Sequence, residues 1–488
     1  MNRKRLERIC TFLICCLVYH CFCLLQTSFA QQVSNPELNV PYAYVGKISS
    51  QHARENQAAP WSIGGETLDR DYANFQAYKQ YLGPLGIPFI RLQGGWAKSE
   101  KEKGKYDFTW LDEIIDDALA QDVQPWVELS YGNPIYKGGG EAALAGGIPT
   151  SEEALKAWDK WAAQMVKRYK DRITYWEIWN EPDISKTITA EEYARFYIRT
   201  ADIIKKYQPD AVLMAIGLAG ISRDEYVDTF LNYLKAQNKL DLVDIITYHG
   251  YAPRPEDSYE YVSKLRDLAK SYDASIELWQ GENGAPSTPA DQTVGAMTNL
   301  DWTEISQAKW FLRRMLGDKG HGIAVTNVFT MSDLHYAKGD HMTGLNSKGL
   351  LRANPDGSIA YVKPSYYAVQ NLVSVMDQPV QTIPAFSLES NADQEITAYA
   401  FQTEEGDKKM LTLWFSDERP DDALQPKATD VSMQGIGFHE PVYIDLLSGK
   451  IYEIPQSSLQ SQEGVLQIKD LPILDVPIMI TEKTMVVE

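Results

Sequence analysis

The feature that most constrains this chain is a repeated alternation of short apolar segments with amphipathic, helix-like segments. It occurs eight times between Trp61 and Met376. The expected strands cover residues 61–65, 87–93, 124–131, 173–180, 211–217, 242–249, 275–280 and 323–330. Strands that alternate with helices form parallel sheets, and eight repeats are enough to close one. The pattern therefore predicts an α/β chain with a (β/α)8 TIM barrel over residues 61–377.

An open, doubly wound sheet is the alternative architecture. It would carry a glycine-rich phosphate loop after the first strand, and Gly64-Gly65-Glu66-Thr67 lacks that pattern.

After residue 377 the sequence pattern changes to short strands separated by turns, such as 395–401 and 409–415. Residues 378–488 therefore predict a small antiparallel β-sandwich. Residues 31–60 are expected to form an N-terminal arm that packs on the main domain.

Residues 1–30 have the features of a secretion signal peptide. A basic start is followed by an apolar run from Ile9 to Leu25 and by the cleavage signal Ser28-Phe29-Ala30. A membrane anchor is one alternative, but the run is short for a membrane span. A lipoprotein is another, but no cysteine follows a small residue at the end of the run. We expect an exported protein, periplasmic or extracellular, without stable membrane insertion after signal cleavage.

Cysteine use and charge exclude several kinds of chemistry. All 5 cysteines lie in residues 1–30, so the mature chain would have no disulfide and no thiolate nucleophile. The remaining histidines are scattered without i,i+4 pairing, and we predict no metal and no cofactor. A net charge of -19 opposes nucleic acid as a partner. A neutral oligosaccharide or polysaccharide substrate is compatible with this charge.

Polar residues gather at the C-terminal ends of the expected strands, where barrel active sites lie. Glu181 ends a tryptophan-rich strand, where poor solvation favours the neutral carboxylic acid, as a general acid requires. Glu282 follows the seventh strand. The fourth and seventh strands face each other across an eight-stranded barrel. Glu181 and Glu282 would thus flank a central site, which is the arrangement for glycoside cleavage by an acid and a nucleophile.

Neighbouring side chains are expected to support this pair. Arg91, on the second strand, would keep Glu282 ionised. Tyr251 would donate a hydrogen bond to Glu282, and Asn180 would bind a sugar hydroxyl. The other predicted substrate-binding residues are His249 and Gln93 at strand ends, and Trp96 and Trp279 as stacking platforms.

Glu128 and Glu177 are two further acidic residues on the expected third and fourth strands. They lie deeper in their strands than Glu181. We expect them to make structural hydrogen bonds inside the barrel.

The segment Trp176-Glu177-Ile178-Trp179-Asn180-Glu181-Pro182 resembles the acid/base motif of the retaining glycoside hydrolases of clan A. In that clan the acid/base glutamate follows an asparagine at the end of the fourth strand, and the nucleophile glutamate ends the seventh. The resemblance assigns these roles to Glu181 and Glu282. This segment and Tyr106-Asp107-Phe108-x-x-Leu111-Asp112 together make the chain most similar to family 39, which includes β-xylosidases and α-iduronidases. A β-sandwich after the barrel is usual in that family.

Two positions depart from the family pattern. The second strand reads Arg91-Leu92-Gln93-Gly94, where family 39 usually has a histidine after the arginine and an aromatic residue. The eighth strand ends in Phe329-Thr330-Met331-Ser332-Asp333, without the tryptophan common in the clan. Both positions line the sugar subsite. These departures count against assigning the family's substrate to this chain more than against assigning the family's mechanism.

The resulting expectation is a retaining glycosidase that acts by double displacement on a plant- or host-type saccharide. The long loops 132–149 and 283–301 could close one end of the groove, which favours an exo-acting, β-xylosidase-like enzyme. An endo-acting glucanase or xylanase is the first alternative. A non-catalytic carbohydrate-binding protein on the same barrel is the second.

Overall fold

The computed structural model describes residues 35–184, 188–338, 341–406, 408–462 and 464–486. The predicted signal peptide, residues 1–30, lies outside the described residues. Among the helices of these ranges, none is both long enough and apolar enough to cross a membrane.

Eight parallel strands close into a barrel, as predicted. They are β2 (Trp61–Gly64), β3 (Phe89–Gln93), β4 (Gln124–Leu129), β5 (Tyr175–Ile178), β6 (Val212–Leu218), β7 (Ile245–Tyr248), β8 (Glu277–Asn283) and β9 (Thr326–Val328). Pairing of β9 with β2 closes the ring. The (β/α)8 fold is confirmed, with β5 as the fourth barrel strand and β8 as the seventh.

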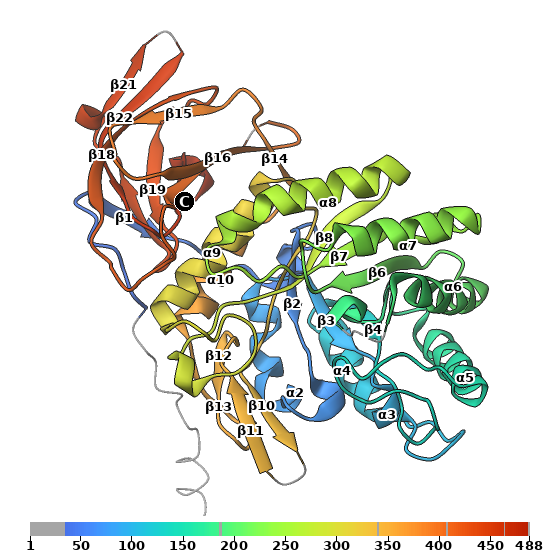
Figure 1. Cartoon of the computed structure of the whole chain (residues 1–488). Helices are drawn as coiled ribbons and strands as arrows, with labels where there is room; N and C mark the ends of the chain where they lie inside the picture. Colours follow the sequence, from blue (N-terminus) through green and yellow to red (C-terminus); the bar gives the residue numbers. More distant parts are fainter. Residues whose placement is uncertain (1–34, 185–187, 339–340, 407, 463, 487–488) are drawn as a thin grey trace, which may run out of the picture.

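Helices surround the barrel on its outer side (Figure 1). They are α2 (Phe75–Tyr78), α3 (Trp96–Ser99), α4 (Thr109–Ala120), α5 (Glu152–Tyr169), α6 (Ala190–Tyr207), α7 (Asp224–Ala236), α8 (Tyr259–Tyr272), α9 (Glu304–Gly320) and α10 (Pro364–Val375). The helix α6 shows why the sequence folds this way. Thr189 accepts a hydrogen bond from the Glu192 backbone, and the Glu192 side chain accepts one from the Thr189 backbone. This capping box starts the helix, and its buried face, including Tyr193 and Ile204, packs inward.

Two hairpins follow the eighth barrel strand. β10 (Leu334–Lys338) pairs with β11 (His341–Asn346), and β12 (Leu351–Ala353) pairs with β13 (Ile359–Val362). Figure 1 shows the first hairpin projecting from one end of the barrel. The connection from β9 to α10 therefore carries much more structure than a simple loop.

The C-terminal region contains two antiparallel sheets, as predicted. Seven strands pair in the order β1-β20-β19-β23-β17-β16-β14, and four in the order β15-β18-β22-β21. Their bounds are β1 (Ala43–Lys47), β14 (Val380–Thr382), β15 (Ser387–Ser390), β16 (Ile396–Thr403), β17 (Lys409–Phe415), β18 (Lys427–Gln434), β19 (Pro441–Asp445), β20 (Lys450–Glu453), β21 (Leu459–Gln462), β22 (Val465–Ile473) and β23 (Ile478–Glu482). The N-terminal arm thus adds an edge strand, β1, to the C-terminal domain (Figure 1).

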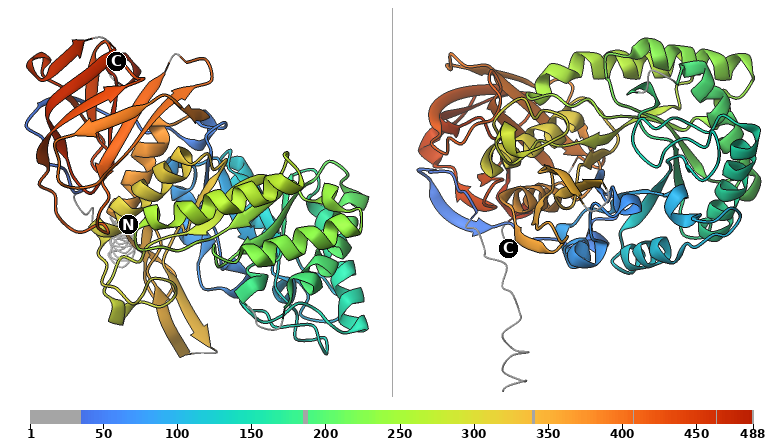
Figure 2. Two further views of the ribbon diagram at one scale, coloured as in Figure 1. Left: turned by 45° about the horizontal axis from the view of Figure 1, so that its top comes forward. Right: turned by 60° about the horizontal axis from the view of Figure 1, so that its bottom comes forward.

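The sandwich is fixed to the barrel through α9. Arg313 is fully buried and donates hydrogen bonds to three backbone carbonyls of the sandwich region, those of Phe415, Glu418 and Asp475. Lys309 Nζ binds Asp475 Oδ1 at 2.5 Å. Figure 2 shows from two further sides that the sandwich lies beside the barrel, against the segment that includes α9.

Candidate active site

The chain leaves β5 in an unusual conformation that directs Glu181. Trp179 and Glu181 have φ angles of +69° and +48°, in the left-handed region that non-glycine residues rarely adopt. The Glu181 backbone N–H donates to the Gly217 carbonyl of β6 at 3.1 Å. Gly217 has φ +58°, and a Cβ there would lie 3.3 Å from Asn180 Oδ1. Strain of this kind is typical of functional sites, where surrounding contacts hold it in place.

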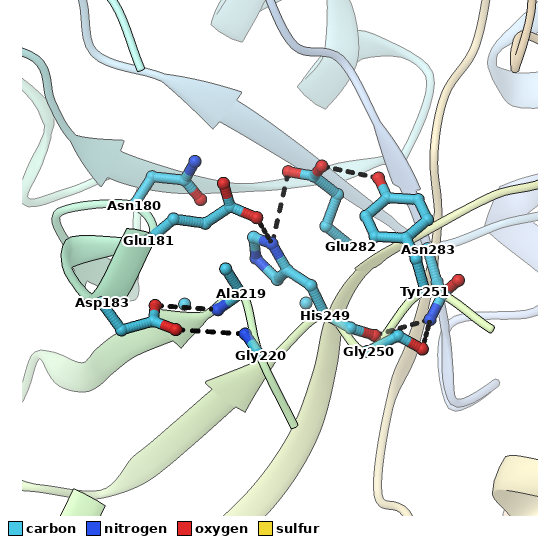
Figure 3. Close-up of polar contacts among 12 residues, drawn as sticks. Asn180, Glu181, Asp183, Ala219, Gly220, His249, Gly250, Tyr251, Glu282 and Asn283 are labelled. Atoms are coloured by element: carbon cyan, nitrogen blue, oxygen red, sulfur yellow. Dashed lines mark hydrogen bonds and ion pairs between the residues drawn. The ribbon is translucent and has the colours of Figure 1, made fainter. Parts of the chain in front are cut away.

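Glu181 and Glu282 meet across the barrel with His249 between them (Figure 3). His249 Nδ1 lies 2.7 Å from Glu181 Oε1 and 3.9 Å from Glu282 Oε2. One oxygen of each carboxyl group and the imidazole nitrogen all lie within 4.8 Å of one another. The Glu181 and Glu282 side chains are 8% and 13% exposed. Carboxyl groups of retaining glycosidases lie about 5 Å apart, those of inverting enzymes about 6.5–9.5 Å. The separation fits the retaining geometry.

Arg91 is the centre of a buried network below this pair. Its Nη1 donates to Glu66 Oε1 at 2.9 Å and to Glu282 Oε2 at 3.0 Å. The other three N–H groups are bound by Glu177 Oε2 at 2.8 Å, Glu128 Oε2 at 2.5 Å and Asn180 Oδ1 at 2.8 Å. A guanidinium has five N–H donors, so all of them are used. Arg91 thereby fixes both Glu282 and Asn180.

The environment moves the pKa values of the two carboxyl groups in opposite directions. Burial raises the pKa of Glu181, although the hydrogen bond with His249 works against the shift. Burial would also raise the pKa of Glu282, but the charges of His249 and Arg91 and hydrogen bonds from Tyr251 and Arg91 lower it. Tyr251 donates to Glu282 Oε1 at 2.7 Å. Glu181 is thus suited to hold a proton and Glu282 to remain ionised.

The position of His249 is itself fixed from the next strand. Asn283 Nδ2 donates to the backbone carbonyls of His249 at 2.5 Å and Gly250 at 3.1 Å (Figure 3). Burial would lower the pKa of His249, but the negative charge of Glu282 and the contact with Glu181 raise it to about 9. The coupled Glu181–His249 pair therefore retains a proton in the neutral range.

Glu181, His249 and Glu282 are also a group within the described residues whose spacing could hold a metal ion. The sequence predicts no metal, and the contacts give a reason to assign this group another role. His249 Nδ1 is occupied by Glu181, and both oxygens of Glu282 accept hydrogen bonds from Arg91 or Tyr251. The Arg91 guanidinium, 3.0 Å from Glu282, would repel a cation.

Gln93 lies beside the site and is hydrogen-bonded to Arg70, a residue that the sequence analysis did not single out. Its Oε1 accepts a hydrogen bond from Arg70 Nη2 at 2.6 Å, and its Nε2 donates to Tyr131 Oη at 3.3 Å. Tyr131 Oη also accepts from Asn180 Nδ2 at 2.8 Å. Gln93 therefore connects Arg70 to the residue beside the predicted acid. No periodicity marks Arg70, because it lies in the connection after β2.

Glu66 is the second residue that sequence reasoning missed. It lies two residues after the end of β2, so the rule that collects polar residues at strand ends would have found it. Glu128 and Glu177 lie where the sequence predicts, inside the barrel, and both bind Arg91.

The prediction that Trp96 and Trp279 stack on sugar rings is wrong. Trp96 is 0% exposed, its ring lies between Tyr136 and Trp161, and its Nε1 donates to Glu100 at 2.6 Å. Trp279 lies three residues before Glu282, about 10 Å along the strand. Its ring packs at 5.6 Å from that of Trp126. Neither ring offers a free face to a sugar, because each is packed among other aromatic rings in the protein core.

Fold and site together define a (β/α)8 barrel with two facing carboxyl groups at the C-terminal ends of its strands. The family model "Glycosyl hydrolases family 39" matches residues 89–276. A protein named Beta-xylosidase from Geobacillus stearothermophilus is 25% identical over 176 residues, which cover 33% of this chain and 34% of that protein. The chain thus matches about a third of the length of this curated relative.

Solved structures show the same architecture. A family 39 glycoside hydrolase from the gut symbiont Bacteroides cellulosilyticus WH2 superposes with a TM-score of 0.63 at 20% identity, covering 89% of this chain and 82% of that one. A monomeric beta-xylosidase from Caulobacter crescentus CB15 gives 0.57 at 18% identity, covering 92% and 99%. The predicted resemblance to family 39 glycoside hydrolases is confirmed.

Proposed function

We propose that this protein is a retaining O-glycosidase, with Glu181 as acid/base and Glu282 as nucleophile. The observation that carries the proposal is the placement of one oxygen of each carboxyl group within 4.8 Å of the other. At that separation one group can attack the sugar directly while the other protonates the leaving oxygen. The raised pKa of Glu181, caused by burial, and the lowered pKa of Glu282, held down by His249 and Arg91 against the effect of burial, support this division of roles.

The reaction proceeds in two displacements. First, the Glu181 O–H donates its proton to the glycosidic oxygen while a Glu282 oxygen attacks the anomeric carbon. The carbon–oxygen bond to the leaving group breaks, and a glycosyl ester of Glu282 forms. Second, the Glu181 carboxylate removes a proton from water, which attacks the same carbon and releases Glu282. Two inversions give net retention.

The surrounding residues act by position. Arg91 and Tyr251 each donate to a Glu282 oxygen and hold the carboxylate in one orientation. Asn180, held by Arg91 and Tyr131, is placed beside Glu181 to bind a sugar hydroxyl. Preorganised donors of this kind lower the cost of reaching the transition state.

The proposed substrate is a plant- or host-type saccharide attacked from a chain end, as by a β-xylosidase. The named activity of the matched relative supports the sugar class. The small exposure of both carboxyl groups supports exo action. The loop after β8 is bonded to β11, from Val294 N to Leu345 O at 2.8 Å. The segment after β11 comes close to the site, because Lys348 Nζ lies 5.8 Å from the centre of the Tyr251 ring. Together the loop after β8 and β11 could therefore close one end of the groove.

We also infer that the protein is exported, to the periplasm or beyond the cell. The basic start, apolar run and cleavage signal within residues 1–30 support this inference. Placement of all 5 cysteines before residue 31 also supports it, since the mature chain would not depend on the redox state of its compartment.

The test of function is the stereochemistry and size of the first product. Incubation with aryl glycosides, followed by proton NMR, should show that the first sugar released keeps the anomeric configuration of the substrate. Xylo-oligosaccharides should yield monosaccharide from the start. Early release of longer oligosaccharides would support the endo-acting alternative. Binding without any turnover across the panel would support the non-catalytic one.

The pH dependence of kcat/KM should be bell-shaped. Its acidic limb reflects protonation of Glu282, whose pKa the charges of His249 and Arg91 hold below its ordinary value. Its alkaline limb reflects loss of the proton held by the Glu181–His249 pair, whose pKa values are raised. Activity is therefore expected in the window between them. Initial rates at subsaturating aryl glycoside from about pH 4 to 10 check this expectation. A monotonic rise with pH would contradict the acid role.

A further inference from the structure

Glu66 and the proposed nucleophile share one nitrogen of Arg91. Nη1 donates to Glu66 Oε1 at 2.9 Å and to Glu282 Oε2 at 3.0 Å. The Glu66 side chain is 1% exposed and lies at the end of β2, on the far side of β3 from β4. Two carboxyl oxygens on one nitrogen lie close together, and like charges at that range oppose joint ionisation.

The charges and hydrogen bonds distinguish Glu66 from the other carboxyl groups around Arg91. Four carboxyl groups surround one guanidinium, so Arg91 cannot neutralise all of them. Glu128, Glu177 and Glu282 each accept hydrogen bonds at both oxygens. Glu66 differs, because its Oε2 is buried and has no hydrogen-bond partner among the described residues. A bare buried anionic oxygen is costly, whereas a neutral carboxylic acid is tolerated.

We propose that Glu66 is a positioning residue that is protonated in the working enzyme and holds Arg91 in place as a neutral acid. Neutral Glu66 accepts a hydrogen bond from Arg91 but carries no negative charge. The positive charge of Arg91 therefore continues to stabilise the Glu282 carboxylate. The inference rests on the proposed role of Glu282 as nucleophile. Glu66 thereby acts through Arg91 and does not touch the sugar.

The other groups around Glu66 are consistent with this state. The titratable groups whose charges act on it are Arg91 from β3, Glu128 from β4, Tyr78 from α2, Tyr251 after β7 and Glu282 from β8. Burial raises the pKa values of both tyrosines, so they are neutral. Burial raises the pKa of Glu66 to about 7, with Arg91 opposing and Glu282 adding to the shift. Glu66 is therefore mainly protonated below about pH 7.

Space at Gly64 maintains the arrangement. A Cβ at Gly64 would lie 2.2 Å from Glu66 Oε2, so the carboxyl group occupies space that a side chain at position 64 would need. A larger residue at position 64 would push the carboxyl group away from Arg91. The position of Glu66 is thus set by the backbone of β2.

Infrared spectroscopy tests the protonation directly, without reference to activity. The difference spectrum between the wild type and Glu66→Gln at about pH 6 should contain the carbonyl band of a protonated carboxylic acid, and this band should fade as the pH rises through about 7. Glu128 does not contribute, because it is present in both proteins. A difference spectrum with only carboxylate bands at that pH would overturn the proposal, whatever the enzyme turns out to cleave.

Kinetics tests the positioning role. Glu66→Ala should slow the labelling of Glu282 by an activated 2-deoxy-2-fluoro glycoside by about 10- to 100-fold, because Nη1 loses a buried partner. Glu66→Gln, which reproduces the shape and neutrality of the acid, should restore most of that rate. Glu177→Gln is the matched control. Its labelling rate should stay low, because both Glu177 oxygens accept hydrogen bonds and the amide nitrogen of glutamine cannot replace an accepting oxygen. Equal losses in Glu66→Gln and Glu66→Ala would show that Glu66 acts as an anion and would refute the inference.

Discussion

Replacing Glu282 with alanine is expected to abolish turnover, with kcat lowered by at least about 10⁴-fold. The glycosyl ester cannot form without this carboxylate, and no neighbouring group can take its place. Glu66 is 1% exposed and is held behind Arg91, and Glu181 is bound to His249 and is proposed to protonate the leaving group. Stopped assays with an aryl glycoside, in parallel with thermal unfolding to confirm that the variant is folded, measure the effect.

Azide distinguishes the nucleophile from the acid. In Glu282→Ala, azide can attack only from the free face, so any glycosyl azide should have the inverted configuration. Glu181→Ala is the matched control. With a leaving group that needs no protonation it should still form the glycosyl ester, and azide should then yield a product of retained configuration. A retained azide product from Glu282→Ala would show that the two roles are assigned to the wrong residues.

Replacing Arg91 with methionine is expected to cause the largest loss of stability. Four buried carboxyl groups share this guanidinium, and removing one partner of a buried ion pair costs about 3–5 kcal/mol. Activity should fall with stability, since Glu282 and Asn180 both lose the donor that orients them. Urea denaturation of the wild type and the variant measures the difference in the free energy of unfolding.

The stability cost of Arg91→Met should grow with pH. Without Arg91 the pKa values of Glu66 and Glu128, which burial already raises, rise further above their unfolded values. Such groups bind more protons in the folded state, so stability is lost as the pH rises through their folded pKa values. In the wild type burial raises the pKa values of Glu66 and Glu128 to about 7 and about 8, so the comparison belongs at about pH 5 and about pH 8. Arg199→Met, which breaks a partly exposed pair with Asp159, should cost less than about 1 kcal/mol. A pH-independent difference for Arg91→Met would contradict this account.

Much of the fold follows from local periodicity. Each barrel strand is a short apolar run followed by a helix with one buried face, and both patterns are visible in a window of a few residues. Counting eight of them implies a closed barrel, and closure places the ends of the fourth and seventh strands, three positions apart, around one central site. The approach of Glu181 to Glu282 follows from that geometry. The edge strand β1 does not, because its partner β20 lies roughly four hundred residues away, and strand pairing depends on contacts that no local pattern records.

The motif at the end of β5 and the position of Glu282 could thus be recognised from the sequence alone, since strand ends on one side of a barrel converge whatever the details of packing. The directions and partners of other side chains were decided by the tertiary structure. Trp96 and Trp279 are buried because neighbouring rings fill the space around them. Glu66 and Glu282 share Arg91 because β2, β3 and β8 bring all three side chains together, and burial, charge and hydrogen bonds there decide which carboxyl group is ionised.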